Sequence, residues 1–345
     1  MNTDETTRIR VATAAELIEA APYLLGFHPS ESLVLIGLRP ASGDPGPRLR
    51  VGVSVRIDLD NRDPTGLDQL SLAAVPSALA EAGCDRAVAL FFTETTSPVA
   101  QRDPALGEAR RSLEDRLAVA FVDVIEAYLV TAERAWSLTC AGPECCPPEG
   151  WVRRPGSAVA AELTYAGLVA RPDREALLAT LDGRGPEARA RLGPALHRAD
   201  ERLLRLIQQK GEQATRRAES AAFTRAAYEC QHGRWLSDRR LVRFGAALRD
   251  GAIRDALWLS IDASMIAAAE ILTQLHSALP SPYDAAPMFL FGWSCWRQGQ
   301  GTLAAEAAER TLRSDPHYSA ATLLAEAIRS GMDPYSTPLL TGQPR

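Results

Sequence analysis

The sequence predicts an N-terminal α/β domain with a mixed sheet, followed by an all-α domain. Helical and strand-like patterns alternate through the first 150 residues, and strand signals nearly vanish after Pro155. The chain has 345 residues, of which 46% are hydrophobic and 23% charged. This composition is typical of a soluble globular protein with about two domains. We therefore expect a mixed α/β domain over residues 8–150 and a helical domain over residues 155–333.

The first elements are predicted by periodicity and by the residues that flank them. A helix is expected over residues 14–25, with Thr13 as its N-cap. Residues 32–38 form a continuous apolar run, which is typical of a strand covered on both faces. Residues 49–59 alternate with period two and are expected to pair with that strand as a hairpin. A hairpin closed at Leu38 and Leu49 would place Ser32 opposite Val55.

Further helices and strands complete the predicted sheet domain. Helices are expected over residues 65–82 and 104–120, and strands over residues 86–92, 122–130 and 135–139. The later helical segments are residues 157–169, 174–181, 187–210, 212–230 and 238–248, with more beyond. The order of these elements favours a mixed sheet.

The end of the chain carries a more specific helical pattern over residues 284–330. Gly292 and Gly299 are seven residues apart, and Ala304 and Pro316 follow. This is the spacing of a tetratricopeptide-like helix pair, in which small residues allow close approach and proline ends the second helix. Such pairs bind peptides or proteins, so a protein partner at the C-terminal helices is expected. The last residues, after Pro334, are expected to fray.

Charge and motifs argue against several classes of function. The net charge is −5, without the basic face of a nucleic-acid-binding protein. No stretch approaches the ~20 apolar residues of a membrane span, and the polar N-terminal sequence favours a cytoplasmic protein. Neither a phosphate-binding P-loop motif nor a dinucleotide-binding glycine motif occurs. We expect no cofactor, with zinc the one alternative left open.

That alternative is carried by the stretch CAGPECCPPEG, which contains Cys140, Cys145 and Cys146. Cysteine is a preferred zinc ligand, but no second cysteine pair or histidine lies nearby to complete four ligands. The same thiols also fit a reversible redox pair or buried thiols in a rigid proline-bounded turn. A zinc site, a thiol redox sensor and a structural turn all stay open.

A second candidate site surrounds the stretch GFHPSESLV. The predicted hairpin brings His28 and Ser32 toward Arg56 and Asp58 at one end of the sheet. A histidine beside a carboxylate is the beginning of a general-base arrangement, which would fit an enzyme such as a hydrolase. The alternative is a structural turn in which the imidazole satisfies main-chain groups.

Four parts of the sequence together resemble a known family. These are AAPYLLGFHPSESLVLIGL, VSVRIDL, CCPPEG and the run from GWSCWRQG to AEAIRSG, spread over residues 12–334. They resemble an uncharacterised actinobacterial family that is catalogued as a domain of unknown function. The resemblance implies one architecture over most of the chain and a cytoplasmic location, and it brings no activity, substrate or cofactor.

The interpretation that the sequence favours is a non-enzymatic binding or regulatory protein that acts through protein–protein contacts. The alternatives are an enzyme at the His28 end of the sheet and a zinc or thiol sensor at the three cysteines.

Overall fold

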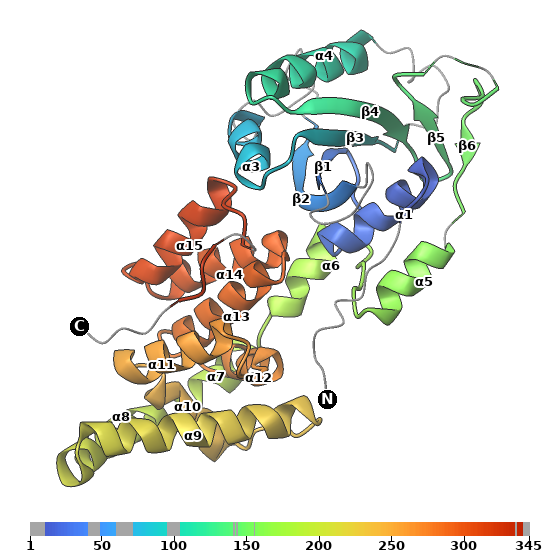
Figure 1. Ribbon diagram of the computed structural model, residues 1–345. Coiled ribbons are helices and arrows are strands. Elements are labelled where there is room, and N and C mark those ends of the chain that lie inside the picture. Colours follow the sequence, from blue (N-terminus) through green and yellow to red (C-terminus); the bar gives the residue numbers. More distant parts are fainter. Residues whose placement is uncertain are drawn as a thin grey trace, which may run out of the picture. The chain divides into compact units, whose positions relative to one another are not determined.

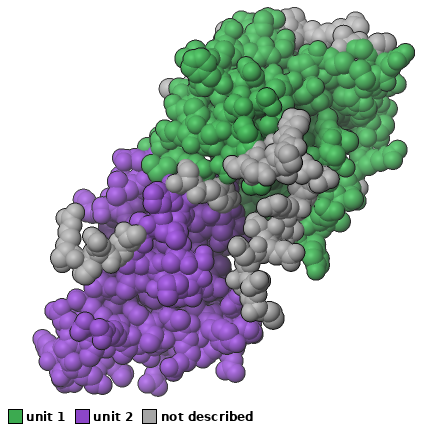
Figure 2. All heavy atoms as spheres, viewed as in Figure 1, with its two compact units in different colours: residues 1–177, 329–333 green, residues 178–328, 334–345 purple. Residues whose placement is uncertain are grey.

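A computed structural model describes residues 11–40, 49–59, 72–94, 104–140, 142, 144–154, 156–334 and 337–340. The chain divides into two compact units (Figure 2). Unit 1 comprises residues 1–177 and 329–333, and unit 2 comprises residues 178–328 and 334–345. The division falls later than the boundary expected near Pro155. The reason is that helix α5 (Ala158–Tyr165) packs on helix α1 (Ala14–Leu25), with Val159 and Leu163 against Ala20.

Unit 1 contains the predicted mixed sheet, with six strands in the order β2-β1-β3-β4-β5-β6 (Figure 1). The strands are β1 (Ser32–Pro40), β2 (Leu49–Asp58), β3 (Arg86–Phe92), β4 (Asp123–Val130), β5 (Arg134–Ser137) and β6 (Trp151–Val152). Strands β3 and β4 are parallel, and every other neighbouring pair is antiparallel. The N-terminal end of β1 therefore lies at the same edge as the C-terminal ends of β2, β3 and β4.

Local sequence explains where the first elements begin and end. The hydroxyl of Thr13 accepts a hydrogen bond from the main-chain N–H of Glu16, and the Glu16 carboxylate accepts from that of Thr13, which forms a capping box. Helix α1 ends at Gly26, whose φ of 85° lies in the left-handed region that glycine adopts without strain. Strand β1 is buried from Ser32 to Leu38, as its apolar sequence predicts.

The core of unit 1 lies between the sheet and helices α3 (Val75–Glu81) and α4 (Pro104–Val119). Leu79 and Leu113 from these helices are fully buried with Leu33 and Phe91 from the sheet. The helix predicted over residues 65–82 is described from Leu72 onward, and its earlier part lies outside the described residues.

The predicted register of the β1–β2 hairpin is wrong. Ser32 lies opposite Asp58, and Val55 lies opposite Leu35. Two causes add up: the strands extend beyond Leu38 to pair Pro40 with Leu49, and the register shifts between Ile36 and Leu38 at a bulge. The bulge adds a residue that hydrophobic alternation alone did not reveal.

Unit 2 is helical, as predicted. Its elements are α6 (Arg174–Leu178, which begins in unit 1), η2 (Ala179–Leu181), α7 (Pro186–Ala190), α8 (Gly193–Lys210), α9 (Glu212–Gln231), α10 (Asp238–Ala247), α11 (Gly251–Asp262), α12 (Ala269–Ala278), α13 (Ala285–Arg297), α14 (Gly301–Ser314) and α15 (Ser319–Arg329) (Figure 1). Among the described residues after Gly156, the one strand-like pairing is an isolated bridge of Arg171 to Phe27. No helix in the described ranges has the length and apolar character to cross a bilayer.

Helices α13 and α14 pack closely at the small residues singled out in the sequence. A Cβ atom on Gly292 would lie 2.8 Å from the Cβ of Ala307, closer than side chains normally approach. The main-chain oxygen of Ala304 lies 3.4 Å from the same point. The close approach of this pair therefore depends on the absence of a side chain at Gly292.

Candidate peptide-binding surface and the predicted site residues

Over residues 337–340 the C-terminal tail is held against unit 2 rather than frayed, and the other residues after Pro334 lie outside the described residues. The carboxylate of Asp262, at the end of α11, accepts a hydrogen bond of 2.7 Å from the main-chain N–H of Leu340. The same carboxylate accepts 2.9 Å from the indole of Trp293 and pairs with Nε of Arg297 at 2.7 Å. We call Asp262, Trp293 and Arg297 the tail-binding surface.

Arg297 binds the tail through a second set of main-chain atoms. Its Nη1 donates to the carbonyl oxygens of Pro334 and Thr337, at 2.5 and 2.8 Å. The guanidinium also lies 6.0 Å from the centre of the Trp293 ring. Because the guanidinium is held by Asp262, its remaining N–H groups point to fixed positions where an extended chain offers carbonyls.

The side chains of the tail contribute much less than its main chain. Leu340 packs against the hydrophobic core of unit 2, whereas Leu339 is 54% exposed and Pro338 is exposed. The surface thus recognises an extended segment by two carbonyls, one N–H and one apolar side chain. Any extended peptide offers such carbonyls and an N–H group, so the one side chain that matters is an apolar residue at the position of Leu340.

The predicted enzyme site is only partly assembled. Arg56 and Asp58 form an ion pair at 2.5 Å, and the Arg56 guanidinium lies 5.7 Å from the centre of the Phe27 ring. His28 is exposed, and its main-chain N–H donates to the carbonyl of Arg171. Within the described ranges, no hydrogen bond or ion pair joins the His28 imidazole to Asp58.

Ser32 is fully buried, and its hydroxyl donates to the main-chain oxygen of Ser30 at 2.5 Å. That bond occupies the proton that a general base would have to remove. Ser32 pairs with Asp58 across the hairpin, but the two side chains form no hydrogen bond among the described contacts. The arrangement offers no nucleophile–base pair within the described residues.

The same sheet edge holds a residue that sequence reasoning missed. Glu31 adopts a φ of 39°, which is uncommon for a residue with a side chain. Its carboxylate accepts from the hydroxyl of Thr93 at 3.0 Å and from the main-chain N–H of Glu94 at 2.7 Å. Glu31 therefore joins the beginning of β1 to the end of β3, which is a structural role.

The three neighbouring cysteines do converge. The sulfur atoms of Cys140, Cys145 and Cys146 all lie within 4.8 Å of one another, and those of Cys140 and Cys145 are 3.3 Å apart. Cys145 is exposed, and the other two are half-buried. This loop follows strand β5, at the opposite end of that strand from the His28 edge.

The chain was also compared with known protein families, curated proteins and solved structures. The family model described as Domain of unknown function (DUF4192) matches residues 15–335. The chain belongs to this family. The match confirms the resemblance to an uncharacterised family. No curated protein and no solved structure matches the chain.

The DUF4192 match includes every predicted site residue and the tail-binding surface, while residues 337–340 of the tail lie beyond it. Family membership assigns no reaction or ligand to any of them.

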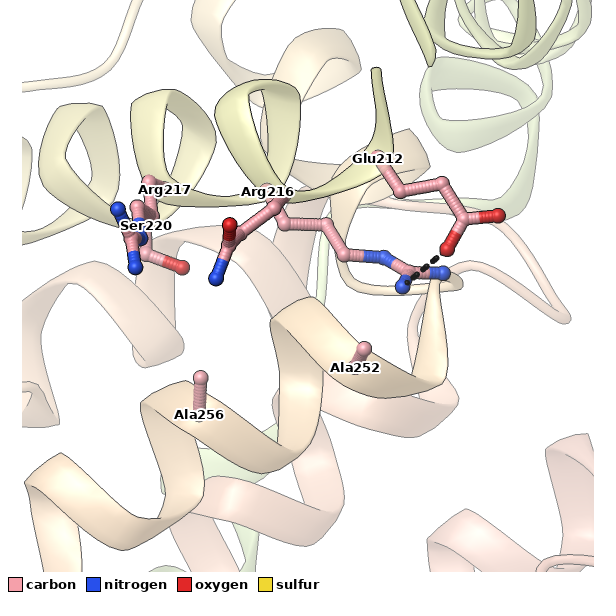
Figure 3. A pocket seen from close by; sticks show the side chains of 7 residues that line it. Glu212, Arg216, Arg217, Ser220, Ala252 and Ala256 are labelled. Carbon is pink, nitrogen blue, oxygen red and sulfur yellow. Dashed lines mark hydrogen bonds and ion pairs between the residues drawn. The ribbon is translucent and has the colours of Figure 1, made fainter. Parts of the chain in front are cut away.

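A shallow pocket of about 440 Å³ lies between α9 and α11 within the DUF4192 region (Figure 3). Its walls are Glu212, Gln213, Arg216, Arg217, Ser220, Ala252 and Ala256. The guanidinium of Arg216 is already held by Glu212 at 2.9 Å and by Asp250. Ala252 and Ala256 form its apolar part, and its described lining contains no histidine or cysteine.

Sequence reasoning missed Asp262 and Arg297. One signal was present: Asp262 ends a mostly apolar helical stretch, LWLSID. A carboxylate in such a position is buried only when it is paired.

Proposed function

We propose that this DUF4192 protein is a non-enzymatic binding or regulatory protein that acts through protein–protein contacts made by its C-terminal helices. The observation that carries the proposal is the recognition of the chain's own tail by Asp262 and Arg297 through main-chain atoms. Main-chain recognition is the general way in which proteins hold extended peptides whose sequences vary.

The helix pair α13–α14 belongs to this proposal as a tetratricopeptide-like unit. Its close packing at Gly292 agrees with that kind of helix pair, and the tail-binding residues Trp293 and Arg297 lie on its first helix. A partner segment would replace the tail and use the same carbonyl and N–H contacts. The tail then competes with the partner, and an attached competitor is present at high effective concentration.

A cytoplasmic location is part of the same proposal. Cys140, Cys145 and Cys146 lie together as free thiols, and exposed thiols persist in a reducing compartment.

The test uses a fluorescent peptide with the sequence of residues 334–345 and a chain that ends at Asp333, so that the peptide alone supplies the carbonyls of Pro334 and Thr337. Fluorescence anisotropy should show binding to the shortened chain and at least roughly 10-fold weaker binding to the intact chain, whose own tail competes. A peptide with Leu340→Ser should lose binding because Leu340 packs into unit 2, whereas Leu339→Ser, at an exposed position, should not.

Arg297→Met in the shortened chain should also abolish binding, since both carbonyl contacts come from that guanidinium. Equal affinity of the Leu340→Ser and Leu339→Ser peptides, or no binding by the shortened chain, would refute the proposal.

A further inference from the structure

The loop of Cys140, Cys145 and Cys146 has no part in the binding function proposed for unit 2, and it belongs wholly to unit 1. We propose that these three cysteines bind one zinc ion, with a fourth coordination position open to a water or to a ligand from a partner. The proposal rests on the convergence of the sulfurs and on the scaffold that fixes them.

The spacing of the sulfurs fits a tetrahedral zinc ion. Zinc–sulfur bonds of about 2.3 Å place two sulfurs of a tetrahedron about 3.8 Å apart. The sulfurs of Cys140 and Cys145 are 3.3 Å apart, and all three sulfurs lie within 4.8 Å of one another. The Cys145 side chain is exposed, so its sulfur can adjust its position without displacing packed residues.

The loop that carries these cysteines is fixed at both ends. The main-chain N–H of Cys140 donates to the hydroxyl of Ser137 at 2.9 Å, and that of Cys146 donates to the carbonyl of Gly142 at 2.7 Å. A Cβ on Gly142 would lie 3.1 Å from the Cys145 sulfur and 3.7 Å from that of Cys140. A side chain at position 142 would therefore meet two of the three sulfurs.

Strand β5 holds the second half of the loop. The indole of Trp136 donates to the carbonyl of Pro148 at 3.1 Å, and Arg134 donates to the carbonyls of Glu149 and Gly150, at 2.9 and 3.2 Å. The thiols therefore meet because the main chain around them is anchored, which lowers the conformational cost of placing three ligands on one ion.

The fourth ligand position follows from the same geometry. Among the described histidine, cysteine, aspartate and glutamate side chains, no fourth one joins the three sulfurs. The carboxylate of Glu126 accepts from the hydroxyl of Thr139, next to Cys140, at 2.8 Å. Glu126 thus lies beside the site as a neighbouring acceptor, and an exposed position remains for a water or a ligand from a partner.

The experiment loads the full chain, purified metal-free under reducing conditions, with Zn²⁺ alone. After removal of excess metal, elemental analysis should find about one zinc per chain. A competition titration with a chelating dye then gives the affinity. Loss of any one thiolate should weaken it by more than the roughly 10–100-fold that follows loss of an outer-shell group.

Cys145→Ser is the decisive variant, because an exposed side chain can be changed without disturbing the fold. Cys230→Ser, at a buried position in unit 2, removes one thiol and should keep the zinc stoichiometry. Cobalt in place of zinc should give sulfur-to-metal charge-transfer absorption in the wild type and lose intensity in Cys145→Ser.

Thiol titration under denaturing conditions separates the outcomes. Six titratable thiols and one bound zinc support the proposal. Six thiols without zinc retention, or zinc retention that survives Cys145→Ser unchanged, would overturn it. Four thiols without zinc would indicate a disulfide within the loop and would overturn it as well.

Discussion

The Nε atom of Arg297 lies 2.7 Å from Oδ1 of Asp262, whose side chain is completely buried. Asp262 also accepts hydrogen bonds from the indole of Trp293 and the main-chain N–H of Leu340, so its buried carboxylate has one ion-pair partner and two hydrogen-bond donors. One residue pair therefore links two helices and the tail of unit 2. Such a pair is costly to break because one partner would remain as a buried charge.

Replacement of Asp262 by alanine should therefore destabilise unit 2 by about 3–5 kcal/mol. Denaturant unfolding followed by tryptophan fluorescence measures this change, since Trp293 is in direct contact with Asp262. Glu201→Ala is the control, because the Glu201 carboxylate is 52% exposed and pairs with Arg205 at 3.7 Å. An exposed pair contributes at most about 1 kcal/mol. Equal effects of the two substitutions would contradict the buried-pair account.

Gly292→Ala should destabilise the α13–α14 pair by roughly 1–3 kcal/mol, because the added Cβ would meet Ala307 at 2.8 Å. Gly301→Ala is the matched control in the same pair. No atom lies within 4 Å of its added Cβ, so alanine there should be neutral or stabilising by up to about 1 kcal/mol. Thermal or denaturant unfolding compares the two variants. A Gly292→Ala protein as stable as Gly301→Ala would show that the helices do not pack as described.

His276 should make unit 2 less stable in mild acid. Burial, and then the charges of the nearby Arg310 and Arg189, together lower the pKa of its imidazole to about 4. Between pH 6.5 and pH 4 the unfolded chain binds a proton that the folded chain does not, so stability falls as pH falls. The loss attributable to this group is on the order of 3 kcal/mol across that range.

His276→Leu should remove that part of the pH dependence, because both ring nitrogens of His276 are buried without a hydrogen-bond partner among the described residues. The free energy of unfolding, measured from pH 7.5 to pH 4.5, gives the slope for each protein. His197→Gln, at a side chain that is 80% exposed, should keep the wild-type slope. Identical slopes for wild type and His276→Leu would mean that the imidazole is already protonated or solvated in the folded state.

The elements that sequence predicted are those specified by short-range chemistry. Thr13 and Glu16 cap α1 within one turn, and the apolar run of β1 needs no distant partner to be recognised as a buried strand. Gly292 was found because its spacing from Gly299 is a local pattern. The mixed sheet and the helical second half follow from the same kind of information.

The register of β1 against β2 was not recoverable in the same way. It depends on where the strands end and on the bulge between Ile36 and Leu38, neither of which changes the hydrophobic pattern. The error displaced Asp58 from its expected place near Pro29 to a position opposite Ser32. A three-residue error in register was enough to misplace the predicted enzyme site.

The contacts on which the two proposals depend were harder to predict, because they join residues far apart in the sequence or depend on a loop conformation. Asp262 and Leu340 are 78 residues apart, and each alone is an ordinary helix end or tail residue. The cysteines were visible in the sequence, but their convergence depends on Gly142 and on the Trp136 bond to Pro148. Those bonds come from a loop conformation that residue spacing does not determine.

Gly150→Ala should disrupt the scaffold of the cysteine loop. Gly150 has a φ of 75°, and an added Cβ would lie 2.6 Å from the Trp136 ring and 2.8 Å from the carbonyl oxygen of Ala135. Gly167→Ala is the control, since its φ of 90° imposes the backbone strain without any atom within 4 Å. Backbone strain of this kind costs about 1–3 kcal/mol, which both variants share.

The steric clash should add roughly 1–3 kcal/mol in Gly150→Ala alone. The readout is twofold: the free energy of unfolding, and the rate at which Cys145 reacts with a thiol reagent in the folded protein. Displacement of the loop breaks the Trp136 bond to Pro148 and separates the sulfurs, so Cys145 should react at a different rate in Gly150→Ala and at the wild-type rate in Gly167→Ala. Equal stability and equal reactivity in the two variants would show that strand β5 does not anchor the loop.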